Sequence, residues 1–284
     1  MENIKRFLKF LSEEDIIMKY QIIFNRVLCY DELLKIKEED IEKIISSSQI
    51  DAVIKLYEVI NFRKINEQLK ECILSLDSDE KIKYCLRLAF SNEFDNDLDK
   101  MKYIEALKEC DDEVVRYAYN VAVSPLYKDS VDGVNYVKMI GKSKEECILP
   151  FLDILYIPIY RSDEDLYEFT ESVCLAREDY MVEYMKYLFM DKDRIPMSYI
   201  DTLLCSKGSK QAYYTYKILS NENALKKDNI EVIAMLFAMS DDDDLENKYN
   251  VLINELNKEE EYPAYKAYDI INSKVKVKTC KDIC

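Results

Sequence analysis

The segment Asp111–Ser124, DDEVVRYAYNVAVS, decides the fold class, because the rest of the chain repeats its pattern. Its two opening acids suit a helix N-terminus, which favours negative charge and side-chain oxygens that cap free N–H groups. Four apolar residues then recur at helical spacing and mark one face: Val114, Ala118, Val121 and Ala122. The segment therefore predicts an amphipathic helix.

The same apolar pattern returns every 33 residues. Moving back by 33 residues gives Asp79–Ser91, DEKIKYCLRLAFS, and moving forward gives first Glu145–Tyr156, EECILPFLDILY, and then Glu178–Met190, EDYMVEYMKYLFM. Another helical segment precedes each copy, and the short linker within each pair makes the two helices antiparallel. A fixed period of this length is typical of repeats that stack on their neighbours.

We therefore predict an all-α protein, an α-solenoid of about six to seven antiparallel helix pairs with a period of about 33 residues. The expected pairs are Lys64–Leu76 with Asp79–Ser91, Leu98–Cys110 with Asp112–Ser124, Val131–Ile140 with Glu145–Tyr156, Glu164–Ala176 with Glu178–Met190, Pro196–Ser206 with Ser209–Ser220, and Ile230–Ser240 with Asp243–Leu256. The low content of Gly (3) and Pro (5) agrees, because hairpin-rich sheets need many such turn residues.

The chain is expected to form a single domain over residues 1–273. Residues 1–62 match the 33-residue pattern poorly and are predicted to form an atypical N-terminal cap, with a helix from Ser12 that extends to about Lys37 and further helices at Glu38–Ser47 and Ile50–Phe62. Residues 63–256 carry the regular repeats, and residues 257–273 form a C-terminal capping helix. Residues 274–284 are predicted to be a mobile tail.

Composition limits the partners and the compartment. The chain has 56 acidic and 40 basic residues, a formal charge of −16, which argues against non-specific binding to nucleic acid or to anionic membranes. No apolar run approaches the roughly 20 residues of a membrane span, and the first residues lack the apolar core of a signal peptide. The 9 Cys are scattered, and Cys85 and Cys147 occupy apolar positions of the repeat, which favours a reducing cytoplasm.

Catalysis finds little support in the residue types. The chain has no His, which removes Ser-His and Cys-His nucleophiles and ordinary catalytic zinc. Its three glycines are too dispersed to form a phosphate loop. We therefore predict a non-enzymatic protein that has no catalytic residues, binds no cofactor and has no metal site.

The wording of Asp111–Ser124 resembles the second helix of a HEAT-like repeat, especially the short variety that begins Asp-Pro-Glu-Val-Arg and continues with alanines. Glu113, Val114, Arg116, Ala118 and Ala122 carry the resemblance. The family implies a right-handed superhelix whose second helices line its concave face, and it usually implies a role in binding other proteins. The other copies share the apolar pattern rather than the wording.

The face of the Asp112 helix that lies opposite its apolar residues carries Arg116 and Asn120. The same two positions of the other copies hold Lys83 and Arg87, Leu149 and Asp153, Val182 and Lys186, Tyr213 and Lys217, and Asn247 and Val251. Five of these twelve residues are basic and one is acidic. If second helices line the concave face, the candidate partner-binding stripe comprises Lys83, Arg87, Arg116, Asn120, Lys186, Tyr213 and Lys217, a groove for an acidic peptide.

Each signal also has a simpler interpretation. The bases of the stripe could pair with carboxylates of adjacent repeats or be solvated. The 23 Tyr could form a recognition face, or could reflect an AT-rich genome that supplies core residues such as Tyr84, Tyr184 and Tyr187. The acidic run Asp241–Glu246 could hold Mg²⁺, or could cap the helix that follows it.

Three functional hypotheses remain open. The first is a cytoplasmic scaffold or adaptor of bacterial or phage origin that binds another protein. The second is an immunity or inhibitor protein that neutralises a basic toxin or nuclease, for which the acids should cluster on one surface. The third is a metal-dependent all-α enzyme that uses Asp241–Glu246.

Overall fold

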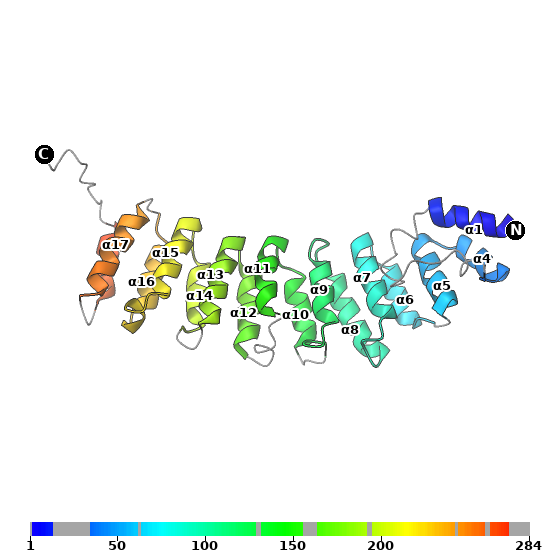
Figure 1. Ribbon diagram of the computed structural model, residues 1–284, viewed down its shortest axis with the longest axis horizontal. Helices are drawn as coiled ribbons and strands as arrows, with labels where there is room; N and C mark the ends of the chain where they lie inside the picture. The colour runs from blue at the N-terminus through cyan, green and yellow to red at the C-terminus, as the bar shows by residue number, and fades with distance from the viewer. Residues whose placement is uncertain are drawn as a thin grey trace. The chain divides into compact units, whose positions relative to one another are not determined.

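The computed structural model describes residues 2–13, 35–61, 64–128, 132–155, 164–191, 195–241, 244–258 and 262–272. Within these residues the chain forms sixteen α-helices and one short 3-10 helix, and it forms no strand (Figure 1). The all-α prediction is confirmed. Each helix packs on its neighbours in chain order, which is the arrangement of an α-solenoid.

The chain divides into two compact units, residues 1–142 and residues 143–284. The first unit contains α1 (Glu2–Glu13), α4 (Glu38–Ile45), α5 (Gln49–Asn61), α6 (Glu67–Leu74), α7 (Asp79–Phe90), α8 (Asp97–Lys108), α9 (Val115–Ala122) and α10 (Gly133–Ile140). The single domain expected over residues 1–273 stays a prediction.

The second unit continues the series. It contains α11 (Glu145–Leu155), α12 (Glu164–Leu175), α13 (Asp179–Met190), α14 (Ser198–Leu204), α15 (Ser209–Leu219), the 3-10 helix η3 (Ala224–Lys226), α16 (Ile230–Ala238), α17 (Leu245–Leu256) and α18 (Ala264–Asn272). All twelve helices predicted for the six repeat pairs are present, as α6 to α17. We call the even-numbered helices from α6 to α16 the first helices, and the odd-numbered ones from α7 to α17 the second helices.

Two elements of the structure were not predicted from the sequence, and two predicted segments fall outside the described residues. Helix α1, which buries Phe7 and Leu11, was not predicted, and neither was η3, which lies between the predicted helices Ser209–Ser220 and Ile230–Ser240. The helix expected from Ser12 toward Lys37 falls almost entirely on residues 14–34, outside the described residues, and stays a prediction. The predicted tail also lies outside them.

Helix α9 shows why the apolar pattern was a reliable guide. The side chains of Val114, Ala118, Val121 and Ala122 are at most 1% exposed, and the alanines let neighbouring helices approach closely. The acids that precede them do not cap the helix as predicted. The helix begins at Val115 after a turn, its N-cap residue is Val114, and the amide of Asp111 donates instead to the carbonyl of Gly141 at 2.8 Å.

The 33-residue period is visible as polar contacts between equivalent positions of consecutive repeats. In the first unit the ammonium of Lys108 donates to the hydroxyl of Ser75 at 3.2 Å, and the two residues are 33 apart. In the second unit the same separation joins Lys144 to the carbonyl of Arg177 at 2.6 Å and Asn229 to the carbonyl of Tyr262 at 2.6 Å. Consecutive pairs therefore stack with nearly constant register inside each unit.

Two lysines are buried because they close helix C-termini. Lys100 on α8 is 1% exposed, and its ammonium donates to the carbonyls of Ala89 at 3.0 Å and Ser91 at 2.8 Å, at the end of α7. Lys248 on α17 donates in the same way to the carbonyl of Ile271 at the end of α18. The last carbonyls of a helix lack intrahelical partners and carry partial negative charge, so a buried ammonium is stabilised there.

We predict that Ala118→Asp destabilises the first unit severely, because it places an unpaired carboxylate in a layer with no exposed surface, at a cost of several kcal/mol. The matched control is Asn120→Asp on the same helix, which is exposed and should change stability by about 0.5 kcal/mol or less. Thermal unfolding followed by circular dichroism compares the two. Equal melting temperatures would show that the buried face of α9 is misassigned.

A second prediction concerns Lys100. Lys100→Met keeps most of the side-chain volume but leaves the carbonyls of Ala89 and Ser91 without their shared donor, which should cost about 1–3 kcal/mol. Lys102→Met on the same helix removes an exposed ion pair with Asp99 and should cost at most about 1 kcal/mol. Urea titration measures both, and a larger loss for Lys102→Met would contradict this assignment.

Candidate functional site

The first unit brings four of the predicted stripe residues onto two adjacent helices. Lys83 and Arg87 lie on α7, and Arg116 and Asn120 lie on α9, which packs beside it. Arg116 and Asn120 are exposed, while Lys83 and Arg87 are partly covered. Arg116 and Asn120 therefore lie on the exposed side of α9, and the role of these four residues in partner binding stays a prediction.

Tyrosine rings hold the cations of this group. The guanidinium of Arg87 lies 4.9 Å from the ring centroid of Tyr119, on the next second helix, and that of Arg116 lies 4.7 Å from the ring of Tyr117. Arg87 has no carboxylate partner among the described residues. Lys83 differs, because it pairs with Glu80 on its own helix at 3.3 Å. A cation over an aromatic ring keeps its hydrogen-bond donors available at the ring edge.

The second unit contains Lys186 on α13 and Tyr213 and Lys217 on α15. Lys186 contacts Asp153, 33 residues earlier, at 3.0 Å, and also Glu183 at 3.9 Å, and these carboxylates raise its pKa. Lys186 thus matches the interpretation that a base of one repeat pairs with an acid of its neighbour. Because the two units are described separately, one continuous stripe along all second helices stays a prediction.

One position of the stripe faces the wrong way. Val182 should point outward by the 33-residue register, but its side chain is fully buried. On α13 the exposed apolar residues are instead Tyr187 and Met190, at 51% and 54% exposure. Tyr187 was expected near the core. A shift of one residue along the chain rotates a helix face by about 100°. A one-residue change in where α13 begins is therefore enough to turn Val182 inward and Tyr187 outward.

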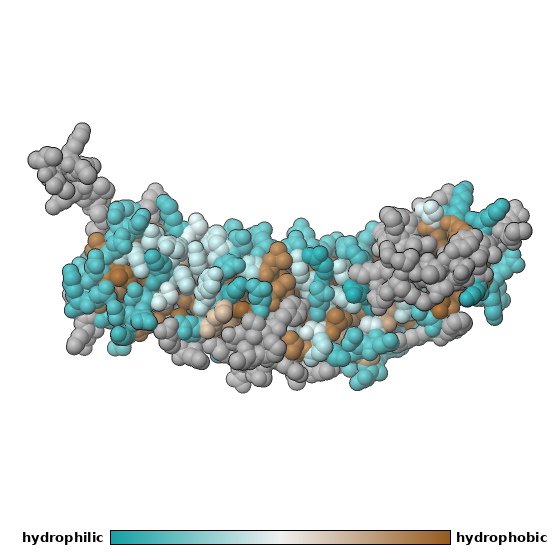
Figure 2. Space-filling model, in the orientation of Figure 1, coloured by the Kyte–Doolittle hydropathy of each residue, from teal (hydrophilic) through white to brown (hydrophobic). Residues whose placement is uncertain are grey.

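The strongest cluster in the second unit is a set of tyrosines on α13, α15 and α17, which we call the tyrosine face. The rings form a chain of contacts across the three helices. Centroid distances are 5.0 Å for Tyr184–Tyr216, 6.2 Å for Tyr184–Tyr213, 6.1 Å for Tyr187–Tyr216, 5.0 Å for Tyr213–Tyr214 and 5.4 Å for Tyr214–Tyr249. Figure 2 shows this region as a pale area over α13 and α15.

Lys217 sits within the tyrosine face. Its ammonium lies 5.3 Å from the ring centroid of Tyr213 and 5.1 Å from that of Tyr249, and it has no carboxylate partner among the described residues. Partial burial acts to lower the pKa of Lys217, but a hydrogen bond with Tyr213 and the surrounding phenols outweigh it and raise the pKa. Burial raises the pKa of Tyr214 and Tyr249 as well, so both phenols keep their proton at neutral pH.

The first helices of the second unit carry a different charge pattern. Helices α12, α14 and α16 contain no Lys and no Arg, and their acids are Glu164, Asp165, Glu168, Glu171, Asp201 and Glu231. Asp201 accepts a hydrogen bond from Ser172 at 3.2 Å, and Glu231 accepts from Ser198 at 3.3 Å. These hydroxyls orient the carboxylates without neutralising them. In the first unit, by contrast, α8 alternates acids with lysines.

The acidic run is only partly described, because residues 242 and 243 lie outside the described residues. Asp241 pairs with Lys207 of the preceding repeat at 2.6 Å. Asp244 is the N-cap residue of α17, but its side chain makes no capping bond to the backbone and accepts from Asn247 at 2.6 Å instead. Within the described part of the chain no three acidic or Cys side chains gather as a metal site. The metal-enzyme hypothesis stays a hypothesis.

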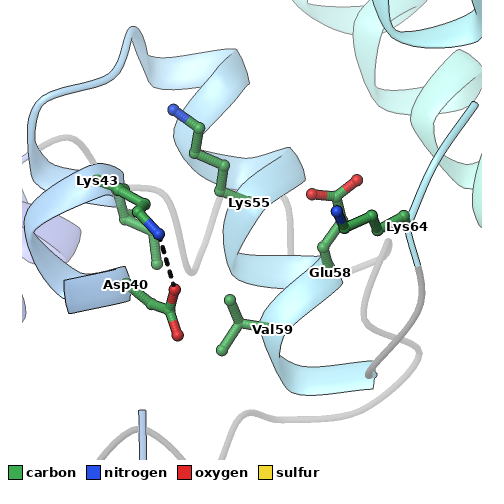
Figure 3. Close-up of a pocket in the computed structure, with 7 residues that line it drawn as sticks. Asp40, Lys43, Lys55, Glu58, Val59 and Lys64 are labelled. Carbon is green, nitrogen blue, oxygen red and sulfur yellow. Dashed lines mark ion pairs between the residues drawn. The ribbon is translucent and has the colours of Figure 1, made fainter. Parts of the chain in front are cut away.

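A shallow pocket of about 450 Å³ lies between α4 and α5 (Figure 3). Its wall combines acids with lysines: Asp40, Lys43, Lys55, Glu58 and Lys64, beside the apolar Ile44 and Val59. Several of these charged groups already have partners. Asp40 contacts Lys43 at 3.7 Å, and a carboxylate oxygen of Glu58 accepts from the amide of Ile65 at 2.9 Å.

Cys85 and Cys147 are buried, as expected of small apolar residues in the repeat. Burial raises the pKa of the Cys147 thiol to about 11 and raises that of Cys85 further, so both thiols stay protonated and unreactive. Cys280 and Cys284 lie outside the described residues. Neither Cys85 nor Cys147 is therefore a candidate nucleophile.

Sequence reasoning found the tyrosines and Lys217 separately but missed their association. The signal was present as YYTYK at residues 213–217, one repeat after Tyr184 and Tyr187. No family model, no curated protein and no solved structure matches the chain. No helix in the described part of the chain is long and apolar enough to cross a membrane.

We predict that the stability of the fold depends on pH through Asp51 on α5. Its carboxylate contacts Lys55 on the same helix at 2.8 Å and Lys70 on α6 at 3.0 Å. Burial acts to raise the pKa of Asp51, but hydrogen bonds from the two lysines prevail and lower it. A lowered pKa stabilises the fold above the unfolded-state value near 4, and this contribution disappears as the pH falls through the folded-state value.

Asp51→Asn should therefore lower the melting temperature at pH 7 and have little effect near pH 2. The control is Asp99→Asn, which removes the exposed ion pair with Lys102 and should shift the melting temperature less at pH 7. Thermal scans across this pH range provide the measurement. The same loss at both pH values for Asp51→Asn would indicate a packing effect rather than an ionic one.

Proposed function

We propose that this protein is a non-enzymatic, HEAT-like repeat protein that binds another protein through its second helices. The observation that carries the proposal is the tyrosine face of the second unit. Its helices leave several apolar and aromatic side chains exposed at about half of their surface, among them Tyr187 (51%), Met190 (54%), Tyr213 (39%) and Val251 (42%). Exposed side chains of this kind, grouped on adjacent helices, are typical of protein interfaces.

The physical properties of tyrosine support this function. A tyrosine supplies a large, rigid contact area and one hydroxyl while losing few side-chain rotamers on binding. The rings of this face are also held by one another, so Tyr213 and Tyr187 are partly ordered before a partner arrives. Preorganised side chains reduce the entropy that association costs.

A second candidate function is the capture of a basic protein, as an immunity or inhibitor protein would do. The specific observation is the concentration of acids on α12, α14 and α16, which lack Lys and Arg. Glu168, Glu171 and Asp201 are exposed there and form no ion pair within the described part of the chain. A one-signed surface accelerates association with an oppositely charged partner.

The main proposal predicts a loss of binding from the tyrosine face. The immobilised protein is used as bait in host extract, together with the double variant Tyr187→Ala and Tyr213→Ala. A specific partner should be retained by the native bait and lost from the double variant by tenfold or more, because aromatic anchors contribute about 2 kcal/mol or more. Circular dichroism checks that both baits are folded.

The control bait is Tyr265→Ala, which removes a tyrosine of 65% exposure from α18, outside the tyrosine face. It should retain the partner. A partner lost equally from both variants, or from neither, would contradict the assignment to this face. For the second candidate, replacing Glu168, Glu171 and Asp201 by their amides should slow association, and the effect should shrink with added salt.

A further inference from the structure

The tyrosine face contains an ammonium group that the fold leaves without an opposite charge. Helix α15 carries Lys210 and Lys217 and no acid. Neither lysine forms an ion pair within the described residues. Several other lysines of the second unit do form ion pairs: Lys186 with Asp153, Lys207 with Asp241, and Lys144 with Glu146 at 3.7 Å. Helix α15 thus carries two cations and no carboxylate in a protein of formal charge −16.

The surroundings of Lys217 explain why it stays ordered without a carboxylate. The rings of Tyr213 on its own helix and Tyr249 on α17 both lie within 5.3 Å of the ammonium, and their negative faces stabilise the charge. An aromatic ring leaves at least one N–H of an ammonium unsatisfied, because it offers no lone pair of the strength of a carboxylate. The protonated phenols of Tyr214 and Tyr249 add O–H donors next to it.

From this arrangement we infer that the tyrosine face binds an extended acidic peptide segment, with one peptide carboxylate received by Lys217 between Tyr213 and Tyr249. This inference rests on the proposed protein-binding function and names the chemistry of the partner. The carboxylate accepts from the ammonium and from a neighbouring phenol. The exposed rings of Tyr187 and Tyr213 contact the aliphatic parts of the segment on either side.

The charges of the second unit favour binding of the acidic segment to the second helices rather than to the first helices. The first helices α12, α14 and α16 of the same unit carry only acids, so they repel an acidic chain. On the second helices the carboxylates nearest to the cluster are Glu183, which pairs with Lys186, and Glu246, which lies close to Tyr214. An acidic peptide can therefore be stabilised at Lys217 and Lys210, but not on the opposite row.

The same stacking surface could in principle suit the bases of single-stranded nucleic acid, which also combine π-faces with negative charge. The observations favour the peptide. Nucleic acid carries one charge per nucleotide and needs a line of cations, whereas α13, α15 and α17 offer only Lys210 and Lys217 without ion pairs. A peptide needs a single carboxylate at Lys217 and apolar contacts beside it.

The test selects peptides without assuming their sequence. A display library of random peptides is panned on the immobilised full-length protein and on its Lys217→Gln variant. A length of about 9 residues is sufficient, because an extended chain rises about 3.3 Å per residue and three packed helices span roughly 20–30 Å. Peptides selected on the native protein should be enriched in Asp and Glu, and this enrichment should be lost on Lys217→Gln.

The control is Lys226→Gln, which removes an exposed lysine of η3 in the same unit and should leave the enrichment unchanged. The best selected peptide, labelled with fluorescein, should bind Lys217→Gln at least about tenfold more weakly than the native protein in fluorescence anisotropy, as expected for a lost charge-assisted hydrogen bond. Its affinity for Lys226→Gln should change less than about twofold. Replacing each acid of the peptide by its amide should reproduce the loss.

Three results would overturn the inference. Selected peptides could be basic or neutral, which would leave a protein-binding role intact but reject an acidic partner. Acidic peptides could bind native protein and Lys217→Gln equally, which would place the contact elsewhere. A fluorescein-labelled oligothymidylate could bind in a Lys217-dependent manner while no peptide does, which would make nucleic acid the ligand.

Discussion

The structure depends on one constraint, which is that a helix pair cannot bury its own apolar face. Each pair exposes small and branched residues on one side, and only the next pair along the chain can cover them. Ala118 and Ala122 show the consequence, because they are completely buried although they lie on one of the shortest helices of the repeat. The polar contacts at 33-residue separation then fix how far each pair slides on its neighbour.

This construction produces two separate surfaces from one chain. Within each unit the first helices form one row and the second helices form the other, so the residues of each row can differ in chemistry without changing the layer between them. In the second unit the difference is large: the first helices carry acids without bases, and the second helices carry tyrosines with unpaired lysines on α15. The overall charge of −16 therefore describes neither surface.

The tyrosines connect stability with recognition. Tyr84 and Tyr119 are almost fully buried and pack on each other at 5.2 Å, so in the first unit these rings belong to the packed layer. In the second unit the equivalent ring chain reaches the surface, where Tyr213 and Tyr187 are partly exposed. The same residue type can do both because its ring packs like an apolar group while its hydroxyl remains able to bond to water or a partner. Lysines over these rings keep their charge at low energetic cost.

The sequence by itself determined the twelve repeat helices, their order and the buried face of helices such as α9. These follow from local spacing, because the 3.6-residue period and the 33-residue repeat are both properties of the chain. It also placed Arg87, Arg116 and Lys217 on the outer side of second helices. The tertiary structure alone decided which of those cations meets a carboxylate and which meets a ring. Lys186 and Lys217 both lie in the second half of a second helix, on consecutive repeats, yet one contacts Asp153 and the other contacts Tyr213 and Tyr249. That outcome depends on the rotation of each helix and on residues one repeat away, which no local pattern records.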